Sequence, residues 1–151
     1  MAGLKINILA IHKIAENSEE AFIVANYLKR IPWKVTINQL EVKGKFPASK
    51  QKICEGELLL KNIPAGNFVI ILDEYGTQFT SKEFSFRLNK ITQPITFIIG
   101  GAYGLSEEIK SRANLLLSLS NMTMPHILAR IILVEQIYRS YTISENHPYH
   151  K

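Results

Sequence analysis

The chain has 151 residues, of which 46% are hydrophobic, enough for one domain with a substantial core and too many for a disordered chain. The net charge of +5 is modest, so it permits an acidic partner such as RNA without requiring one. The single cysteine, Cys54, excludes an internal disulfide and a cysteine-based metal site. No apolar run reaches the length of a membrane span. The apolar start is interrupted by Lys5 and lacks a secretory cleavage pattern, so we expect a cytoplasmic protein.

The first part of the chain alternates predicted strands and helices. Residues 4–11 form an apolar strand, and residues 33–42 form a second strand with clearer alternation. Residues 14–30 between them are predicted to be helical, with Ser18 as an N-cap. The most basic stretch, residues 43–52, is a loop leading into another helix. It is either a solvated loop or an arm that contacts nucleic-acid phosphates.

The alternation continues after the Pro-Ala-Gly turn that ends this helix. Residues 67–72 are apolar without alternation, which is typical of a strand covered on both faces. Two further strands are predicted at residues 95–99 and 114–119, preceded by helices that begin after Thr80 or Ser81 and after Ser106. The pattern predicts a single α/β domain over residues 1–151, with a mostly parallel sheet and helices on both faces.

The final predicted helix follows Met124 and Pro125 and extends to Tyr141. Pro125 suits the first helical position, because its missing N–H has no partner there. The helix is apolar on more than one face, whereas a surface helix of a monomer needs only one apolar stripe. We therefore expect it to be covered from two sides, by its own sheet and by another surface.

Three predicted strand ends have the composition of a ligand site. Open parallel sheets bind ligands beyond the carboxyl ends of their strands. The ends are residues 72–76, 100–104 and 118–125, and the second is rich in glycine. Its G-G-x-x-G spacing is not the dinucleotide fingerprint, and no phosphate-loop lysine follows. The pattern therefore indicates either a backbone-lined pocket or simply a tight turn, and spacing alone favours neither.

The titratable groups on the final helix are candidates for chemistry. His126 lies near the helix start, where the dipole disfavours an imidazolium, so we expect it to be mostly neutral at pH 7. A capping or core histidine is the plainer interpretation. Arg130 lies four residues on, on the same face. Glu135 and Arg139 are also four apart and can form an ion pair of little energetic weight.

The C-terminal sequence NHPYHK, residues 146–151, is unusual for a chain end, since chain ends usually fray. An imidazole, a phenol and an ammonium can stack on a base and contact a phosphate. Metal binding by His147 and His150 is conceivable, but no further ligand cluster accompanies them. No metal site is therefore predicted.

Several of these segments together resemble the RlmH family of SPOUT-class methyltransferases. The resemblance rests on FIIGGAYGLS, LSLSNMTMPHILARIILVEQIYRSY, NHPYHK and VIILDEYGTQFTSKEFS, and it covers essentially the whole chain. It implies an α/β fold with a C-terminal trefoil knot, and a homodimer. It also implies methylation of N3 of a pseudouridine in large-subunit ribosomal RNA, with S-adenosylmethionine as cofactor. The implied partner is ribosomal RNA or the assembled ribosome, not DNA or a membrane.

The resemblance also assigns site residues. As a hypothesis for the mechanism, Arg130 and Arg139 would orient RNA phosphates or base carbonyls. His126 or a tail histidine of the partner subunit would remove the N3 proton. The chain departs from many members at Ala102-Tyr103, so no essential carboxylate is assigned there, and its basic loop is shorter than in some members. The implied cofactor contacts are Leu72, Gly100, Gly101, Gly104, Ser120, Asn121, Met122, Thr123, Met124 and Pro125. The implied catalytic residues are His126, Arg130, Arg139, His147 and His150.

Two alternative functions stay open. One is a SPOUT enzyme that acts on transfer RNA; the short chain without an extra RNA-binding domain argues against it. The other is a non-catalytic RNA- or ribosome-binding module that has kept the fold. The intact glycine loop and the intact NMTMPH run argue against a loss of cofactor binding. An assay of methyl transfer separates these alternatives.

Overall fold

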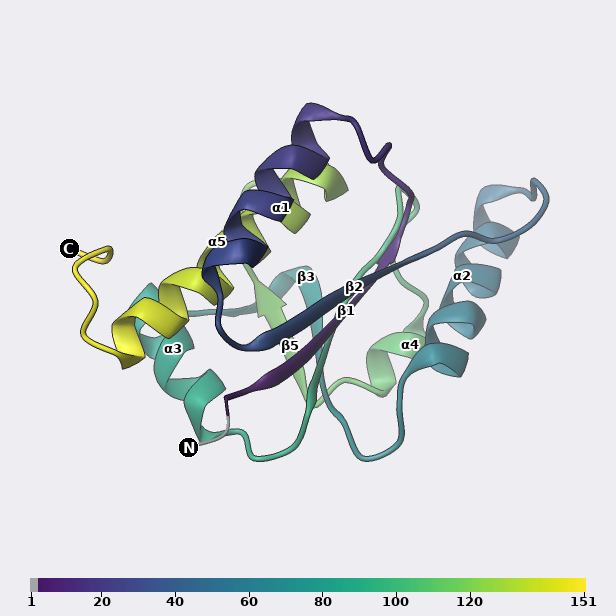
Figure 1. Cartoon of the computed structure of the whole chain (residues 1–151). Helices are drawn as coiled ribbons and strands as arrows, with labels where there is room; N and C mark the ends of the chain where they lie inside the picture. The colour runs from purple at the N-terminus through teal and green to yellow at the C-terminus, as the bar shows by residue number, and fades with distance from the viewer. Residues whose placement is uncertain (1–2) are drawn as a thin grey trace.

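The computed structural model describes residues 3–151 and shows one five-stranded sheet between two layers of helices (Figure 1). The strand order is β2-β1-β4-β3-β5, and every neighbouring pair is parallel. The predicted α/β class with a parallel sheet is thus confirmed, while residues 1 and 2 of the predicted domain lie outside the described residues. The strands are β1 (Lys5–Ile11), β2 (Lys34–Leu40), β3 (Phe68–Gln78), β4 (Ile95–Ile99) and β5 (Leu115–Ser118). The helices are α1 (Glu19–Arg30), α2 (Ala48–Asn62), α3 (Ser81–Lys90), α4 (Glu107–Ser111) and α5 (His126–Ser144).

Two apolar clusters hold the layers together, one on each face of the sheet. Helices α1, α3 and α5 cover one face, where Phe97 of β4 packs with Leu133 and Ile137 of α5. Helices α2 and α4 cover the other face, with Leu59 and Ile109 in the cluster. All of these side chains are fully buried. A strand covered on both faces favours apolar residues, which explains why all five residues of β4 are buried and why its one polar side chain, Thr96, accepts a hydrogen bond from Asn67 at 2.7 Å.

The helix starts follow the predicted caps, but the first helix is shorter than predicted. Ser18 Oγ accepts a hydrogen bond from the Ala21 N–H at 3.1 Å, and α1 begins at Glu19 instead of residue 14. The preceding segment is held elsewhere, because the Ile14 N–H donates to Gln39 Oε1 at 2.8 Å. At α3 the cap is Thr80, which forms a reciprocal capping box with Glu83.

Strand β3 continues past Leu72 to Gln78, whereas the sequence predicts a strand over residues 67–72 alone. Leu72 and Thr77 both pair with Leu117 of β5, so residues 73–76 bulge out of the sheet between them. The bulge needs Gly76, because a Cβ there would lie 2.6 Å from the Leu116 carbonyl carbon and oxygen. The Asp-Glu-Tyr-Gly segment is therefore an insertion within a strand, not the loop that follows one.

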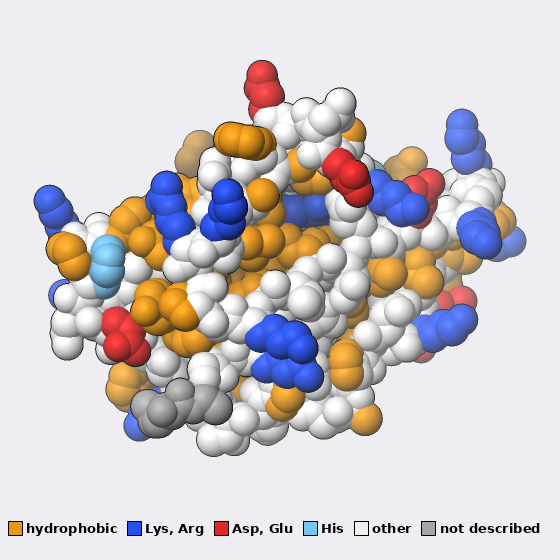
Figure 2. Space-filling view, in the orientation of Figure 1, with side chains coloured by type: hydrophobic (Ala, Val, Ile, Leu, Met, Phe, Trp, Pro, Cys, Tyr) orange, Lys and Arg blue, Asp and Glu red, His pale blue; other side chains and the backbone are white. Residues whose placement is uncertain are grey.

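Helix α5 is only partly covered within the chain. It begins at His126, with Pro125 at the N-cap, one position from the predicted start. One side packs on the sheet and on α1 and α3. Leu128 and Ile132 of α5 are 48% and 36% exposed, and Phe22 of the adjacent α1 is 71% exposed. Figure 2 shows apolar side chains at the surface around α1. The second apolar side of the helix thus faces solvent in a single subunit.

Candidate functional site

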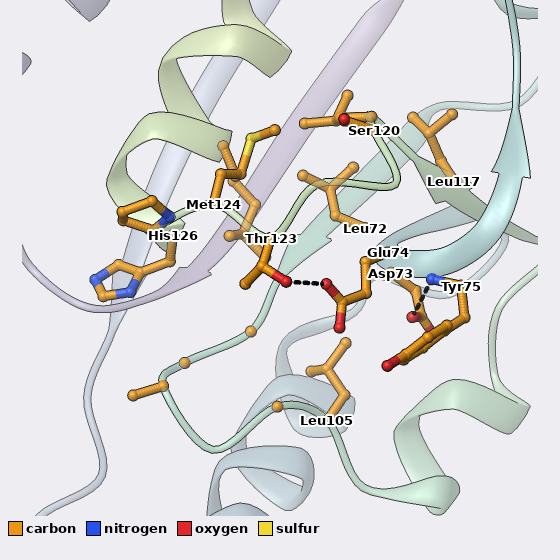
Figure 3. A pocket seen from close by; sticks show the side chains of 18 of the residues that line it. Leu72, Asp73, Glu74, Tyr75, Leu105, Leu117, Ser120, Thr123, Met124 and His126 are labelled. Carbon is orange, nitrogen blue, oxygen red and sulfur yellow. Dashed lines mark hydrogen bonds between the residues drawn. The ribbon is translucent and has the colours of Figure 1, made fainter.

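A cavity of about 610 Å³ lies between the bulge within β3 and the carboxyl ends of β4 and β5 (Figure 3). Its walls come from the bulge after Leu72, the loop 100–105 after β4 and the loop 119–125 after β5, and the first turn of α5 closes one side. The three segments singled out in the sequence therefore meet at one place, although the first of them lies within a strand and not at its end. The volume is within the range of small-molecule sites.

The loop after β4 forms a wall made largely of backbone. The Gly104 N–H donates to the Gly101 carbonyl at 3.1 Å, which closes a tight turn. Gly104 has a φ of +79°, a conformation that favours glycine. Leu105 is buried directly after the turn and anchors the loop, and Ser106 caps α4. A ligand can therefore approach the main chain of this loop closely.

The loop after β5 is fastened to the bulge in β3. Ser118 Oγ lies 3.0 Å from the carbonyl oxygens of both Glu74 and Ser120. Thr123 Oγ1 donates to Glu74 Oε2 at 2.8 Å across the cavity rim, as Figure 3 shows. The Met122 N–H donates to Ser120 Oγ at 3.0 Å. These bonds hold the two walls together.

The cavity lining is mostly apolar, with one paired charge at its side. The basic side chain among its described lining residues is Lys110, whose Nζ lies 3.4 Å from Asp73 Oδ2. Because Lys110 is paired, the lining offers no free cation to a polyphosphate. The lining suits a ligand with a flat apolar part and with polar groups that bond to main-chain atoms. The apolar lining residues are Leu72, Ile99, Ala102, Leu105, Leu117, Leu119, Met122, Met124, Pro125 and Ala129.

Most of the predicted cofactor contacts line this cavity. The exception is Asn121, which is exposed and lies outside the lining. The sequence predicts the Asp-Glu-Tyr-Gly segment as part of a ligand site but not its place within β3, because that place depends on the register of β3 against β5. Lys110 and Ala129 reach the cavity from within helices, and no local pattern marks them. The lining residues that were not assigned as cofactor contacts include Asp73, Glu74, Tyr75, Leu105, Lys110 and Ala129.

His126 lies at the rim of the cavity, in the first turn of α5. Its ring stacks on the ring of His12, with centroids 3.7 Å apart and planes within 8°. Burial lowers the pKa of His126 below its ordinary value, and the nearby His12 and Arg130 lower it further. The predicted neutral imidazole is therefore supported, but its causes are burial and the neighbouring His12 and Arg130, not the helix dipole.

Arg130 is buried, with 2% of its surface exposed. Its Nη1 donates to Gln39 Oε1 at 2.7 Å, and its Nη2 donates to the His12 carbonyl at 2.8 Å. Burial lowers the pKa of Arg130. The guanidinium joins α5 to the ends of β1 and β2. It is placed to hold the frame of the site and not to reach an RNA phosphate.

Arg139 lies at the other end of α5, in a cluster with the C-terminal tail. Its Nε and Nη2 donate to Glu135 Oε1 at 3.0 and 2.7 Å, which confirms the predicted ion pair. The Nη1 lies 3.0 Å from His150 Nδ1, and the guanidinium lies 4.8 Å from the Tyr149 ring centroid. Hydrogen bonding to Glu135 raises the pKa of Arg139. Tyr149 also donates its hydroxyl to Glu135 at 3.0 Å, so the tail is packed on the helix.

The predicted catalytic residues do not all meet within the chain. Arg139 follows His126 by 13 positions in a continuous helix, which separates them by about 20 Å along the axis. His147 is exposed, and its Nδ1 accepts from the Tyr149 N–H at 3.2 Å. Figure 1 shows the tail at the far end of α5 from the strand ends that form the cavity.

Neither a metal cluster nor a membrane span is seen in the described part of the chain. Within residues 3–151, no three His, Cys, Asp or Glu side chains come together in a way that would hold a metal ion. None of the helices in that range has the length and apolarity needed to cross a bilayer.

Known proteins with similar sequences share nearly the whole chain. Residues 4–150 match the family model described as "Predicted SPOUT methyltransferase". A relative from Dictyoglomus thermophilum is 44% identical over 97% of this chain and 99% of its own length. Another, from Halothermothrix orenii, is 39% identical over 98% of this chain and 100% of its own. Both are named Ribosomal RNA large subunit methyltransferase H.

Solved structures show the same fold at low sequence identity. A probable methylase family protein from Haemophilus influenzae matches with a TM-score of 0.59 and 15% identity, over 98% of this chain and 71% of that one. A SpoU methyltransferase from Streptomyces viridochromogenes, in complex with the cofactor AdoMet, matches with a TM-score of 0.52 and 12% identity, over 93% and 59%. With the full-length sequence relatives, these matches confirm the resemblance found in the sequence, and the chain belongs to the SPOUT methyltransferase family.

Proposed function

We propose that this protein methylates N3 of a pseudouridine in large-subunit ribosomal RNA, with S-adenosylmethionine as methyl donor, and that it acts as a cytoplasmic homodimer. The observation that carries the proposal is the ordered cavity between the β3 bulge and the ends of β4 and β5, in a chain whose full-length relatives are named ribosomal RNA methyltransferases. The pseudouridine, the dimer and the trefoil knot rest on the resemblance described above.

The residues present fit the cofactor. Its adenine and ribose need an apolar slot and main-chain hydrogen-bonding groups, which the glycine loop and residues 119–125 provide. It carries no phosphate, in keeping with a lining whose lysine is already paired to Asp73. Leu72 projects into the cavity between the two loops (Figure 3). When bound, S-adenosylmethionine supplies an electrophilic methyl group.

The chain's own residues must place N3 of the base and take its proton. His126 is the titratable ring at the cavity rim, and its lowered pKa keeps it unprotonated near pH 7. A neutral imidazole is a suitable proton acceptor at that pH. We therefore assign it the role of general base. Arg130 positions the first turn of α5 through His12 and Gln39. Holding the base in place contributes much of the acceleration in such reactions.

The exposed apolar side of α5 supports a symmetric dimer. A single subunit leaves Leu128 and Ile132 of α5 and Phe22 and Ile23 of α1 exposed. An isologous interface buries the same face of both subunits. If the two α5 helices pack antiparallel, the C-terminal end of one lies beside the N-terminal end of the other. Arg139 and the tail then reach the partner's cavity, where they orient RNA phosphates or base carbonyls.

Methyl transfer from labelled S-adenosylmethionine to ribosomes tests the proposal. The ribosomes come from a strain lacking this protein, and the labelled nucleotide is identified by nuclease digestion and mass spectrometry. We expect label on N3 of a pseudouridine in large-subunit RNA. Label in transfer RNA alone would replace the substrate. Absence of cofactor binding by calorimetry would leave a non-catalytic ribosome-binding module.

A further inference from the structure

His12 has a backbone conformation that histidine rarely adopts. It follows the last residue of β1 and has a φ of +119°, which places it in the region that favours glycine. Such a conformation persists in a folded protein only where the surroundings impose it, and it is often found at functional sites. A side chain at this position therefore costs conformational free energy in the backbone, so we expect the imidazole to make an interaction that glycine could not make.

Hydrogen bonds from two other elements fix the His12 backbone. Its N–H donates to the Leu40 carbonyl at the end of β2, at 3.2 Å. Its carbonyl accepts from Arg130 Nη2 of α5 at 2.8 Å. These bonds would be available to glycine as well, so they explain the conformation of the residue but not the presence of an imidazole.

The imidazole of His12 is held by stacking. Its Nε2 is buried and has no hydrogen-bond partner among the described residues. The ring lies face to face with His126, with centroids 3.7 Å apart and an interplanar angle of 8°. His126 in turn lines the cavity. The stack thus joins the His12 ring to a residue of the site.

We propose that His12 is a positioning residue whose ring stacks on His126 and holds that imidazole at the cavity rim. The role as a support for a general base rests on the proposed function, whereas the stack itself does not. His12 limits the rotation of the His126 ring and shields one of its faces from water. Together with Arg130, it sets the electrostatic surroundings of the ring.

The stack has a consequence for proton affinity. Burial, His12 and Arg130, in that order, lower the pKa of His126. His12 comes from the segment after β1, and Arg130 comes from α5 itself. Removing the His12 ring both hydrates His126 and removes a neighbouring titratable group. The pKa of His126 then rises towards its ordinary value of about 6.5.

His12→Gly and His12→Phe form a matched pair of variants for the test. Glycine accepts the positive φ without strain, so this variant loses the ring while the backbone is relieved. Phenylalanine keeps a flat ring and the same backbone demand but cannot titrate. A comparison of the two separates stacking from charge.

The experiment is an NMR titration of the His126 Hε1–Cε1 resonance in the full-length protein, assigned with His126→Gln. We expect an upfield ring-current shift in the wild type and in His12→Phe that is lost in His12→Gly. We also expect the pKa of His126 to rise in His12→Gly, and methyl transfer at pH 6 to fall several-fold relative to pH 8. An unchanged His126 resonance and pKa in His12→Gly would overturn the proposal.

The same titration, read together with the turnover of the wild type and of His126→Gln, separates this proposal from the proposed function. If the resonance and pKa of His126 respond to His12→Gly while His126→Gln keeps normal turnover, the stack is real and the assignment of His126 as base is wrong. If the wild type transfers methyl groups but the resonance does not respond, the function stands and the role of His12 is wrong.

Discussion

The two ends of α5 each present an arginine, and the two arginines have opposite surroundings. At the N-terminal end, Arg130 is 2% exposed and bonds to groups at the ends of β1 and β2. At the C-terminal end, the Arg139 side chain is 25% exposed and bonds within its own helix and to the tail. One arginine joins distant parts of the chain, whereas the other is presented at the surface in a fixed orientation.

This difference indicates how one helix can serve two roles. A buried guanidinium stabilises a frame, because its removal leaves buried acceptors unpaired. A guanidinium held by a carboxylate at the surface costs little to lose from the fold but has free N–H groups for a substrate. The N-terminal end of α5 thus helps to build the cavity, and in the proposed dimer the C-terminal end is available to complete the partner's site.

The greatest change is expected in turnover, when Arg139 near the C-terminal end of α5 is replaced. Arg139→Ala should lower methyl transfer about 100- to 1,000-fold, the loss typical of a charged group that orients the reacting substrate. Cofactor affinity by calorimetry should stay unchanged, since Arg139 is not among the cavity-lining residues and its proposed role is to orient the RNA and not the cofactor. Arg87→Ala removes an exposed arginine of α3 and serves as control. Wild-type turnover in Arg139→Ala would remove the tail end from the mechanism.

The next largest effect is on stability, from the buried end. Arg130→Met should lower the free energy of unfolding by about 3 kcal/mol, because Gln39 and the His12 carbonyl lose a charged donor. Denaturant unfolding measures the change. Arg139→Met should cost less than about 1 kcal/mol in the same assay, as expected of a partly exposed ion pair. Equal losses for the two variants would contradict the contrast between the ends.

A smaller effect is expected where the two cavity walls join. Thr123→Val removes the hydrogen bond to Glu74 and should weaken cofactor binding about fivefold, equivalent to about 1 kcal/mol. Calorimetry with S-adenosylmethionine measures it. Glu74→Gln keeps an oxygen acceptor and should bind nearly as well as the wild type. If Thr123→Val binds normally, the bond between the walls has no part in ordering the cavity.

The smallest effect is a pH dependence of stability from His126. Its pKa is lowered in the folded state, so the unfolded chain binds more protons as the pH falls below about 6.5. The contribution of His126 is therefore complete above that pH and is lost as the pH falls towards the lowered pKa. Unfolding of the wild type and His126→Gln across pH 5 to 8 measures it. The difference between the two proteins should shrink on acidification, and a difference that grows would be the wrong sign.

The parts of this structure that follow from local patterns could be predicted from the sequence. Ser18 and Ser106 mark helix starts through the hydrogen bonds of a single turn. The glycine turn at 100–104 and the polar run after β5 mark strand ends, and parallel strands bring their ends to one edge. The location of the cavity therefore followed from topology alone.

The features that depend on packing could not be predicted in this way. The bulge after Leu72 depends on the register between β3 and β5. The spacing of His126 and Arg130 placed them on one helix face, but only packing decides that Arg130 is buried. The stack of His12 on His126 joins residues from opposite ends of the chain. No local pattern distinguishes His12 from an ordinary residue at the end of a strand.

Subunit complementation tests the composite site most directly. Leu72→Trp fills the cavity and should abolish cofactor binding, with Leu72→Met as a control that conserves volume. Arg139→Ala leaves the cavity intact but inactivates the tail end. The two inactive variants are co-expressed with different tags, and the mixed dimer is purified.

If each cavity is completed by the partner's Arg139, the mixed dimer holds one fully wild-type site. We then expect it to recover about half of the wild-type methyl transfer, while each homodimer of a single variant stays inactive. A mixed dimer in which each cavity uses its own subunit's Arg139 has no intact site. If the purified mixed dimer recovers no activity, although it is folded and binds one cofactor, the result would contradict the division of roles between the two ends of α5.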